Sequence, residues 1–314
     1  MTKRHETRGG GVALVVLAAL FWGLSGGVGG VLMASGWDPF VVSFYRGAIG
    51  LLFVLGWLSL RPRRSGLASG RLWFWAVVAG IGVAGNFSFY FLSIAHGSVA
   101  VAATLMYCAP VFVYMVSFLC GLESQTAAKW VAIAVVMAGI GLLTQIHDVG
   151  SGGVTWPGVA AGLLAGLSYA IFIFGFKNAG RHGSPQAILA IAFAVVCLVL
   201  VWPGEAGQFA AVPRSAEWPL FAGLGIFGAG LSFLFYIAGL NRTPSTVASV
   251  VAMVEPVTAS LFGVIVLNQV LAGPQVLGMA LILITVTTLS MHSKSAGAPT
   301  MKNPNHGEKT KQRT

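Results

Sequence analysis

The chain has 314 residues, of which 56% are hydrophobic and only 8% are charged, and its net charge is +10. A soluble protein carries about a quarter charged residues, so this composition excludes an ordinary soluble domain and indicates an integral membrane protein. The three cysteines, Cys108, Cys120 and Cys197, all lie within apolar runs, which argues against disulfides and thiolate metal sites.

Residues 1–10 form a polar, basic N-terminal tail without a cleavable signal sequence. Ten apolar segments follow, each close to the ~20 residues that a bilayer requires. They cover residues 11–34, 38–60, 72–94, 98–119, 127–145, 156–178, 185–202, 217–239, 245–267 and 272–291. Residues 292–314 are polar and lysine-rich, which predicts a disordered C-terminal tail.

The basic residues are distributed unevenly between the two sides of this arrangement. Sixteen of the 18 lysines and arginines lie in the tails and in the links on the N-terminal side of the membrane. Of the other two, Arg214 lies in an opposite link and Arg46 lies inside the second segment. The positive-inside rule then predicts a multi-pass protein of the cytoplasmic (inner) membrane with both termini in the cytoplasm. This explanation of the charge makes a nucleic-acid partner unnecessary.

The sequence repeats itself with an offset of 146 residues. Identical residues at this spacing, without a gap, include the pairs Phe87/Phe233, Phe89/Phe235, Tyr90/Tyr236, Pro110/Pro256 and Val111/Val257. The copies cover residues 11–145 and 156–291 and contain five predicted helices each. Because five is odd, the second copy enters the membrane from the opposite side. The predicted fold is therefore all-α, with ten transmembrane helices in two inverted five-helix repeats, a design typical of transporters with a substrate site at the repeat interface.

Several short motifs add a more specific resemblance. They are Phe21-Trp22-Gly23, Arg46, the segment 95–111, Glu123 and Glu255-Pro256. Together with the duplication, they resemble the drug/metabolite transporter superfamily, in particular its ten-helix EamA-type exporters. The usual Gly-Glu of that family is Leu122-Glu123 in the first half and Asn268-Gln269 in the second. The resemblance implies export, or less often uptake, of amino acids and other small metabolites.

Two charged residues inside the membrane are candidates for the transport chemistry. Arg46 lies eight residues inside the second segment, counted from Asp38, or about 12 Å deep. It is predicted either to hold a substrate carboxylate or pair with Glu255, or else to snorkel or bind carbonyl groups at a helix end. Glu255 lies about 16 Å along the ninth segment, near mid-bilayer, and is a candidate proton-coupling or gating residue. The alternative is that Glu255 only braces the kink at Pro256.

Aromatic and amide side chains in the same layer are candidate substrate contacts, because they can stack on a solute or bind its polar end. The predicted substrate-binding residues are Arg46, Trp22, Asn86, Tyr90, Tyr107, Tyr169 and Tyr236. Pro110 and Pro256 are predicted to kink their helices and to take part in gating together with Glu255. Packing alone is the competing explanation for each of the aromatic residues.

Glycines recur every four residues in two segments that the repeat relates to each other, at Gly26 and Gly30 and at Gly158, Gly162 and Gly166. This spacing predicts close helix crossings. The sequence contains no Walker loop and no metal-ligand spacing, so neither a cofactor nor a metal is expected.

The leading hypothesis is a secondary transporter for a small organic solute, an amino acid or similar metabolite, coupled to protons or driven by its own gradient. An integral-membrane enzyme acting on lipid-linked substrates is the alternative, but it would need several acids or histidines at one interface. A channel is less compatible with an inverted repeat. Besides the solute, the expected partners are membrane lipid and possible coupling protons, and the sequence does not predict an oligomeric state.

Overall fold

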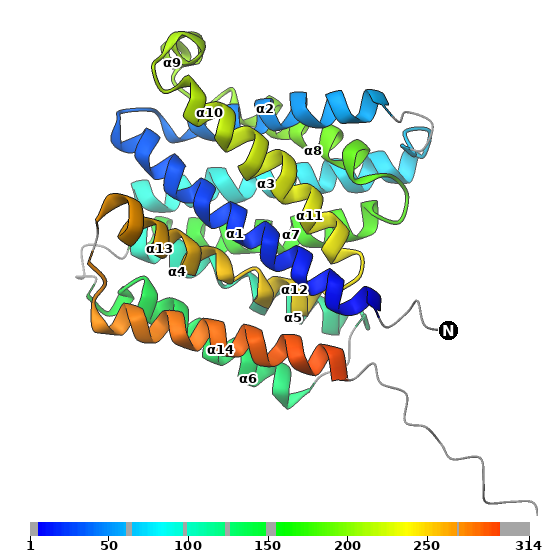
Figure 1. Ribbon diagram of the computed structural model, residues 1–314, viewed down its shortest axis with the longest axis vertical. Coiled ribbons are helices and arrows are strands. Elements are labelled where there is room, and N and C mark those ends of the chain that lie inside the picture. Colours follow the sequence, from blue (N-terminus) through cyan, green and yellow to red (C-terminus); the bar gives the residue numbers. More distant parts are fainter. Residues whose placement is uncertain are drawn as a thin grey trace, which may run out of the picture.

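The computed structural model describes residues 6–60, 65–96, 99–122, 126–148, 155–268 and 270–295, which fold into helices joined by short links (Figure 1). Among these residues, seven helical segments are long and apolar enough to cross a membrane. They are Gly10–Ala34, Pro39–Leu60, Gly70–Ala95, Val101–Leu119, Trp156–Ala179, Trp218–Leu240 and Ser245–Leu267. Three shorter apolar helices, Ala127–Leu143, Pro185–Leu200 and Gly273–Thr288, lie where three further spans are predicted. The chain is therefore an all-helical, multi-pass membrane protein.

The first half contains six α-helices. Their bounds are α1 Glu6–Ala34, α2 Pro39–Leu60, α3 Gly70–Ala95, α4 Val99–Met106, α5 Ala109–Leu119 and α6 Ala127–Leu143, and a short 3₁₀ helix follows at Ile146–Asp148. The α1–α2 link ends at Asp38, a residue type that caps the first turn of a helix. The Asp38 carboxylate accepts the backbone N–H groups of Phe40 at 2.8 Å and Val41 at 3.1 Å, which satisfies donors that the first turn leaves unpaired.

The second half has a similar order with one irregular span. Its helices are α7 Trp156–Ala179, α8 Pro185–Leu200, α9 Ala206–Ala211, α10 Trp218–Gly225, α11 Ser232–Leu240, α12 Ser245–Val251, α13 Val254–Leu267 and α14 Gly273–Ser295. A π-helical segment, η6 (Ile226–Leu231), joins α10 to α11 within one span. Thr155 caps α7 and Ser184 caps α8, each accepting a backbone N–H. π-Helical turns are rare in proteins, and those that occur are frequently found at functional sites.

Two spans are broken near the shared prolines. Residues Tyr107 and Cys108 separate α4 from α5, and Ala252 and Met253 separate α12 from α13. Pro110 and Pro256 each lie within the first turn that follows the break. Proline is tolerated there because the N–H groups of a first turn have no partner within the helix. At the predicted kinks, the regular helix is thus interrupted for two residues within a segment that otherwise continues as one span.

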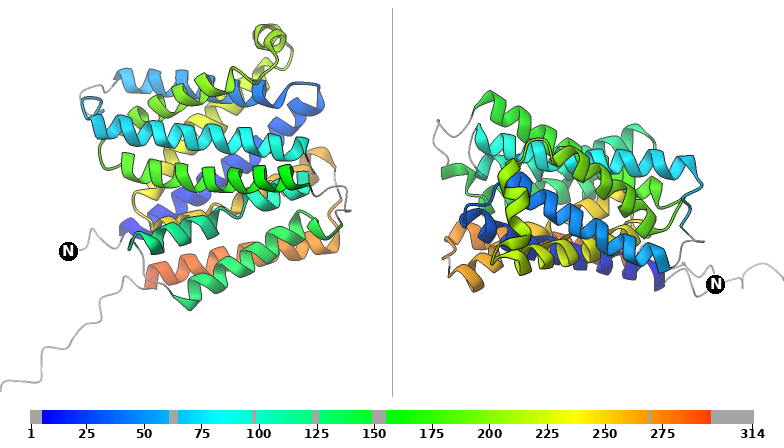
Figure 2. Two further views of the ribbon diagram at one scale, coloured as in Figure 1. Left: turned by 180° about the vertical axis from the view of Figure 1, so that it is seen from behind. Right: turned by 90° about the horizontal axis from the view of Figure 1, so that it is seen from above.

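The helices form layers that bring the two halves together. Helix α3 packs along α7 and also contacts α8, while α1 packs against α11 and α13. Helices α6 and α14, which end the two halves, lie side by side along one flank of the bundle in both views (Figures 1 and 2). Several helices extend beyond the predicted spans, and two of them do so by four residues or more. Helix α1 begins at Glu6 and α14 continues to Ser295, because a helix can continue past the apolar segment that crosses the lipid.

The glycine spacing has different outcomes in the two related helices. On α7, an added Cβ at Gly158 would lie 2.9 Å from the backbone oxygen of His96, and one at Gly166 would lie 2.8 Å from that of Leu105. On α1, Gly26 and Gly30 have no atom within 4 Å of the same position. The close crossing predicted from spacing is therefore correct for α7 and wrong for these two glycines of α1. Gly26 instead lines a cavity.

Candidate functional site

A cavity of about 260 Å³ lies between the two halves of the chain. Helices α1, α2, α3, α7 and α13 contribute side chains to its lining, together with the break between α4 and α5. The predicted residues that line it are Trp22, Arg46, Asn86, Tyr90, Tyr107, Tyr169 and Glu255. Its volume is just under the range of about 300–1,000 Å³ that is usual for ligand pockets, which suits a small metabolite.

Arg46 is held by the irregular span of the second half. Its Nε and Nη2 groups donate hydrogen bonds to the Gly228 carbonyl at 3.1 and 2.7 Å. Gly228 lies in the π-helical segment, and its carbonyl also accepts the Ser232 hydroxyl at 2.8 Å. The guanidinium carbon lies 5.5 Å from the centre of the Phe87 ring. These contacts fix one edge of the guanidinium and leave Nη1 without a hydrogen-bond partner among the residues described.

The glycine at position 228 is required by a close approach of two helices. A Cβ added to Gly228 would lie 2.4 Å from the Cβ of Ser25 on α1 and 3.5 Å from the Arg46 Nε. Contacts of 2.4 Å do not occur between real side chains, so a larger residue would force the helices apart. The close approach of α1 therefore helps to place the carbonyl that holds Arg46.

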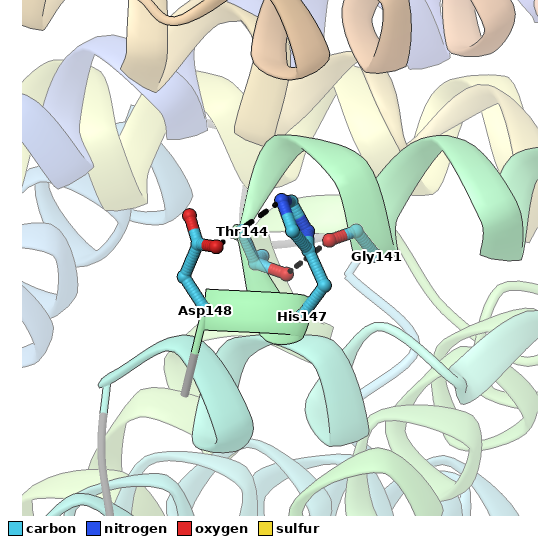
Figure 3. Close-up of polar contacts among 4 residues, drawn as sticks. All are labelled: Gly141, Thr144, His147 and Asp148. Atoms are coloured by element: carbon cyan, nitrogen blue, oxygen red, sulfur yellow. Dashed lines mark hydrogen bonds and ion pairs between the residues drawn. The ribbon is translucent and has the colours of Figure 1, made fainter. Parts of the chain in front are cut away.

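Glu255 lines the same cavity from the start of α13 and is partly buried. Within the described part of the chain, its carboxylate makes no hydrogen bond and no ion pair with Arg46. The ion pair found between described residues lies outside the cavity. It joins His147 and Asp148, beside the Thr144–Gly141 contact at the end of α6 (Figure 3). The cavity thus has one cationic and one anionic group that do not neutralise each other by direct contact.

Two buried polar atoms at this site have no hydrogen-bond partner within the part of the chain that the structure describes. They are the Trp22 indole Nε1 and the Tyr169 hydroxyl, and each side chain is only 4% exposed. A buried polar group without a partner costs about 1–3 kcal/mol. Both residues line the cavity, but the two atoms themselves are fully buried, so a polar solute could supply the missing partners only after a movement of these side chains.

The other residues predicted to bind substrate differ in their position and in the groups that they contact. Tyr90 and Tyr107 line the cavity from α3 and from the break in the fourth span. Asn86 also lines it, but its Nδ2 donates to the Ala165 carbonyl at 3.0 Å and so ties α3 to α7. Tyr236 is fully buried outside the cavity lining, with its ring 4.8 Å from that of Trp22. It therefore supports Trp22 from behind instead of facing the cavity.

The two prolines do not line the cavity. Pro110 and Pro256 are buried and outside the lining of the cavity; Pro256 directly follows Glu255, and Pro110 lies three residues after Tyr107. Glu123 lies outside the described residues. Tyr45, which precedes Arg46 on α2, does not line the cavity, and its hydroxyl donates to the Phe209 carbonyl at 2.6 Å in α9.

Sequence reasoning missed several parts of this site. Ser25, Met33, Phe91 and Met106 also line the cavity. Ser25 follows Trp22 by three residues and so lies on the same face of α1, a signal that was present in the spacing. The Gly228 carbonyl is a backbone group, and only the match of Gly228 with Gly82 in the repeat marked its position.

The cavity approaches one end of the bundle. Its lining follows α1 from Trp22 to Met33 and reaches Pro39 at the start of α2. At the other end of α1, the helix packs tightly on α11: an added Cβ at Gly239 would lie 2.6 Å from the backbone oxygen of Gly11. In the middle of α1, an added Cβ at Gly23 would lie 2.5 Å from the backbone oxygen of Glu255. The cavity is therefore closed toward the N-terminal end of α1.

Known proteins are similar to this chain over most of its length. An uncharacterized transporter of Archaeoglobus fulgidus is 29% identical, with 87% of this chain and 93% of the relative covered. The uncharacterized transporter YwfM of Bacillus subtilis is 24% identical, with 88% and 92% covered. The threonine/homoserine exporter RhtA of Escherichia coli is 25% identical over a shorter stretch, with 65% and 66% covered.

A solved crystal structure has the same fold, with a TM-score of 0.75 at 19% identity, covering 93% of this chain and all of the other. The profile of the EamA-like transporter family matches residues 9–145 and 156–291. These matches exclude the enzyme hypothesis, and the resemblance noted from the motifs is confirmed. The chain belongs to the EamA-like transporter family and is a membrane transporter.

Proposed function

We propose that this protein is a secondary transporter that exports an amino acid or a closely related zwitterionic solute by alternating access. The observation that supports this most directly is the cavity lined by both Arg46 and Glu255 without a direct ion pair between them. A guanidinium binds a carboxylate well through paired N–H groups, and a carboxylate binds an ammonium group. An amino acid carries both of these charges on one carbon atom.

The unsatisfied polar groups and the size of the site support the same solute class. The Trp22 indole and the Tyr169 hydroxyl lie beside the two charges without partners among the described residues, so a small side-chain movement would let them bind a polar solute. A cavity of about 260 Å³ has room for a small metabolite. The similarity to a protein named as a threonine/homoserine exporter points in this direction too. We take Tyr90, Tyr107 and Asn86 as further substrate contacts.

The proposed architecture has ten spans, in inverted repeats at residues 11–145 and 156–291. Helices α6, α8 and α14 then cross the membrane in addition to the seven longer segments. The distribution of basic residues supports cytoplasmic termini and insertion in the inner membrane. On this topology, the cavity faces the outside of the cell, because it approaches the α1–α2 link.

Glu255 is the proposed coupling residue. It is the acidic side chain that lines the cavity, so proton binding there would compete with binding of the solute's ammonium group. Proton entry from outside would then accompany solute exit. Tyr107 lies within the break before Pro110, and Glu255 lies two residues after the break before Pro256. A bend of either span at its break would therefore move a residue of the site.

Exchange in proteoliposomes tests the function. Vesicles loaded with an unlabelled amino acid should accumulate the labelled one, whereas the matching amide, which lacks the carboxylate, and the matching hydroxy acid, which lacks the ammonium group, should exchange poorly. A panel of amino acids gives the side-chain preference. Equal exchange of the amino acid, its amide and its hydroxy acid would refute recognition of both charges, and no exchange of any amino acid would refute the solute class.

A further inference from the structure

A second cavity, of about 250 Å³, lies between α1 and the span formed by α10 and the π-helical segment. Phe21, Leu24 and Val28 line it from one side, and Gly223 and Phe227 from the other. Its rim is open, because Leu24 is 45% and Phe227 50% exposed. Both helices belong to segments that are long and apolar enough to cross a membrane. This groove therefore faces lipid and not water.

Among the described residues that line the groove, the Ser25 hydroxyl and the Gly228 carbonyl, which could otherwise hold water, are both engaged. The Ser25 hydroxyl donates to the Trp22 carbonyl at 2.9 Å. The Gly228 carbonyl is occupied by Arg46 and Ser232. A buried water needs about two to four polar partners, and an apolar cavity without them stays dry. Hydrocarbon is the remaining filler for a groove at this position.

The length of the groove matches one leaflet. Its lining runs along the span formed by α10 and the π-helical segment. It begins at Pro219, next to the span's first residue Trp218, and ends at Gly228. The nine steps from Pro219 to Gly228, at about 1.5 Å each, correspond to about 13 Å of helix, and half of the hydrocarbon core is about 15 Å. The stacked rings of Phe21 and Phe227, 6.1 Å apart, lie at the inner part of the groove. We propose that the groove is a binding site for one phospholipid acyl chain of the leaflet nearest Trp218.

The location gives such a chain a role in transport. Ser25 and Leu224 line both the groove and the candidate substrate cavity, so they form the wall between the two. An acyl chain in the groove holds α1 and α10 apart and supports this wall from the lipid side. Any movement that closes α1 onto α10 must expel the chain. This inference concerns lipid occupancy and does not depend on which solute is transported.

Photolabelling of the full chain in phosphatidylcholine nanodiscs tests the site. The probe is phosphatidylcholine with a diazirine at mid-chain, and mass spectrometry locates the labelled residues. Phe227 and Phe21 should be labelled at least fivefold more than Leu52, which is 68% exposed on α2. Gly223→Leu fills the groove, because position 223 has open space around an added Cβ. This variant should lower labelling of Phe227 at least fivefold.

The matched control is Gly56→Leu, which adds the same side chain at another glycine with open space, outside the groove. It should leave labelling of Phe227 unchanged. If Gly223→Leu fails to fold, Leu24→Ala opens one wall of the groove and should reduce labelling of Phe227 and not of Leu52. Equal labelling of Phe227 and Leu52 would overturn the proposal. Loss of amino-acid exchange in Gly223→Leu with unchanged lipid labelling would also overturn it, since the groove would then belong to the solute.

Discussion

Replacing Arg46 separates its two roles, anchoring to the π-helical segment and binding of a carboxylate. In Arg46→Met, the Gly228 carbonyl loses two hydrogen bonds but keeps the one from Ser232. It is therefore not left without a partner, and we expect the fold to survive. A substrate carboxylate in the cavity would lose its cation. Removing one partner of a buried charge pair costs about 3–5 kcal/mol.

Because Arg46 is only partly buried, we expect the lower end of that range, about 3 kcal/mol, or roughly 100-fold weaker binding. Arg46→Lys keeps the charge but loses the planar fork, so we expect a smaller loss, of about tenfold. The amide analogue has no carboxylate and should bind the wild-type protein and both variants equally. The measurement is the concentration dependence of exchange in proteoliposomes.

Arg214→Met is the matched control, since it removes an exposed arginine outside the cavity. It should leave exchange unchanged. Thermal unfolding in detergent verifies that each variant is folded. Folded Arg46→Met could instead exchange amino acids as the wild type does, or lose affinity for the amino acid and for its amide analogue equally. In either case Arg46 only anchors α2 to the Gly228 carbonyl, and the carboxylate-binding argument is wrong.

Glu255→Gln should abolish accumulation driven by a pH gradient, because the amide cannot release a proton. Exchange of labelled for unlabelled amino acid should persist only at higher solute concentrations, because the ammonium group loses its carboxylate partner; a wild-type protein insensitive to an imposed pH gradient would exclude the coupling role. Topology reporters placed after Thr314 and after His147 should report opposite sides of the membrane, whereas the same side for both would contradict five spans per half. Gly23→Ala should destabilise the protein by about 1–3 kcal/mol, since the added Cβ meets the backbone of α13. Gly30→Ala, where the space is open, should be neutral or slightly stabilising in the same thermal unfolding assay; equal losses would contradict the crossing described here.

The helical pattern could be predicted from the sequence because lipid demands long apolar segments, and the links carry proline, glycine and charged residues. The breaks before Pro110 and Pro256 follow from the chemistry of proline. The short helices α6 and α8, with 17 and 16 residues, show the limit of length as a criterion. The predicted segments at 127–145 and 185–202 included link residues that are not helical.

The candidate site was harder to predict, because residues that are equivalent in sequence are not equivalent in the structure. Tyr90 and Tyr236 are partners in the repeat, yet Tyr90 lines the cavity and Tyr236 packs behind Trp22. A cavity that approaches only one end of the bundle breaks the symmetry that the sequence implies. The π-helical segment has no signal either, since Gly82, the partner of Gly228, lies in the regular helix α3.

The unequal distribution of charge between the repeats has a stereochemical consequence. At the offset of 146, the partner of Arg46 is Ala192 and the partner of Glu255 is Ala109. The cavity therefore has a single cationic and a single anionic pole, and the twofold relation of the halves does not extend to its chemistry. An amino acid bound at both poles would have one orientation, with its side chain directed to one wall of the cavity. Three fixed directions around one carbon atom are enough to distinguish the L enantiomer from the D enantiomer.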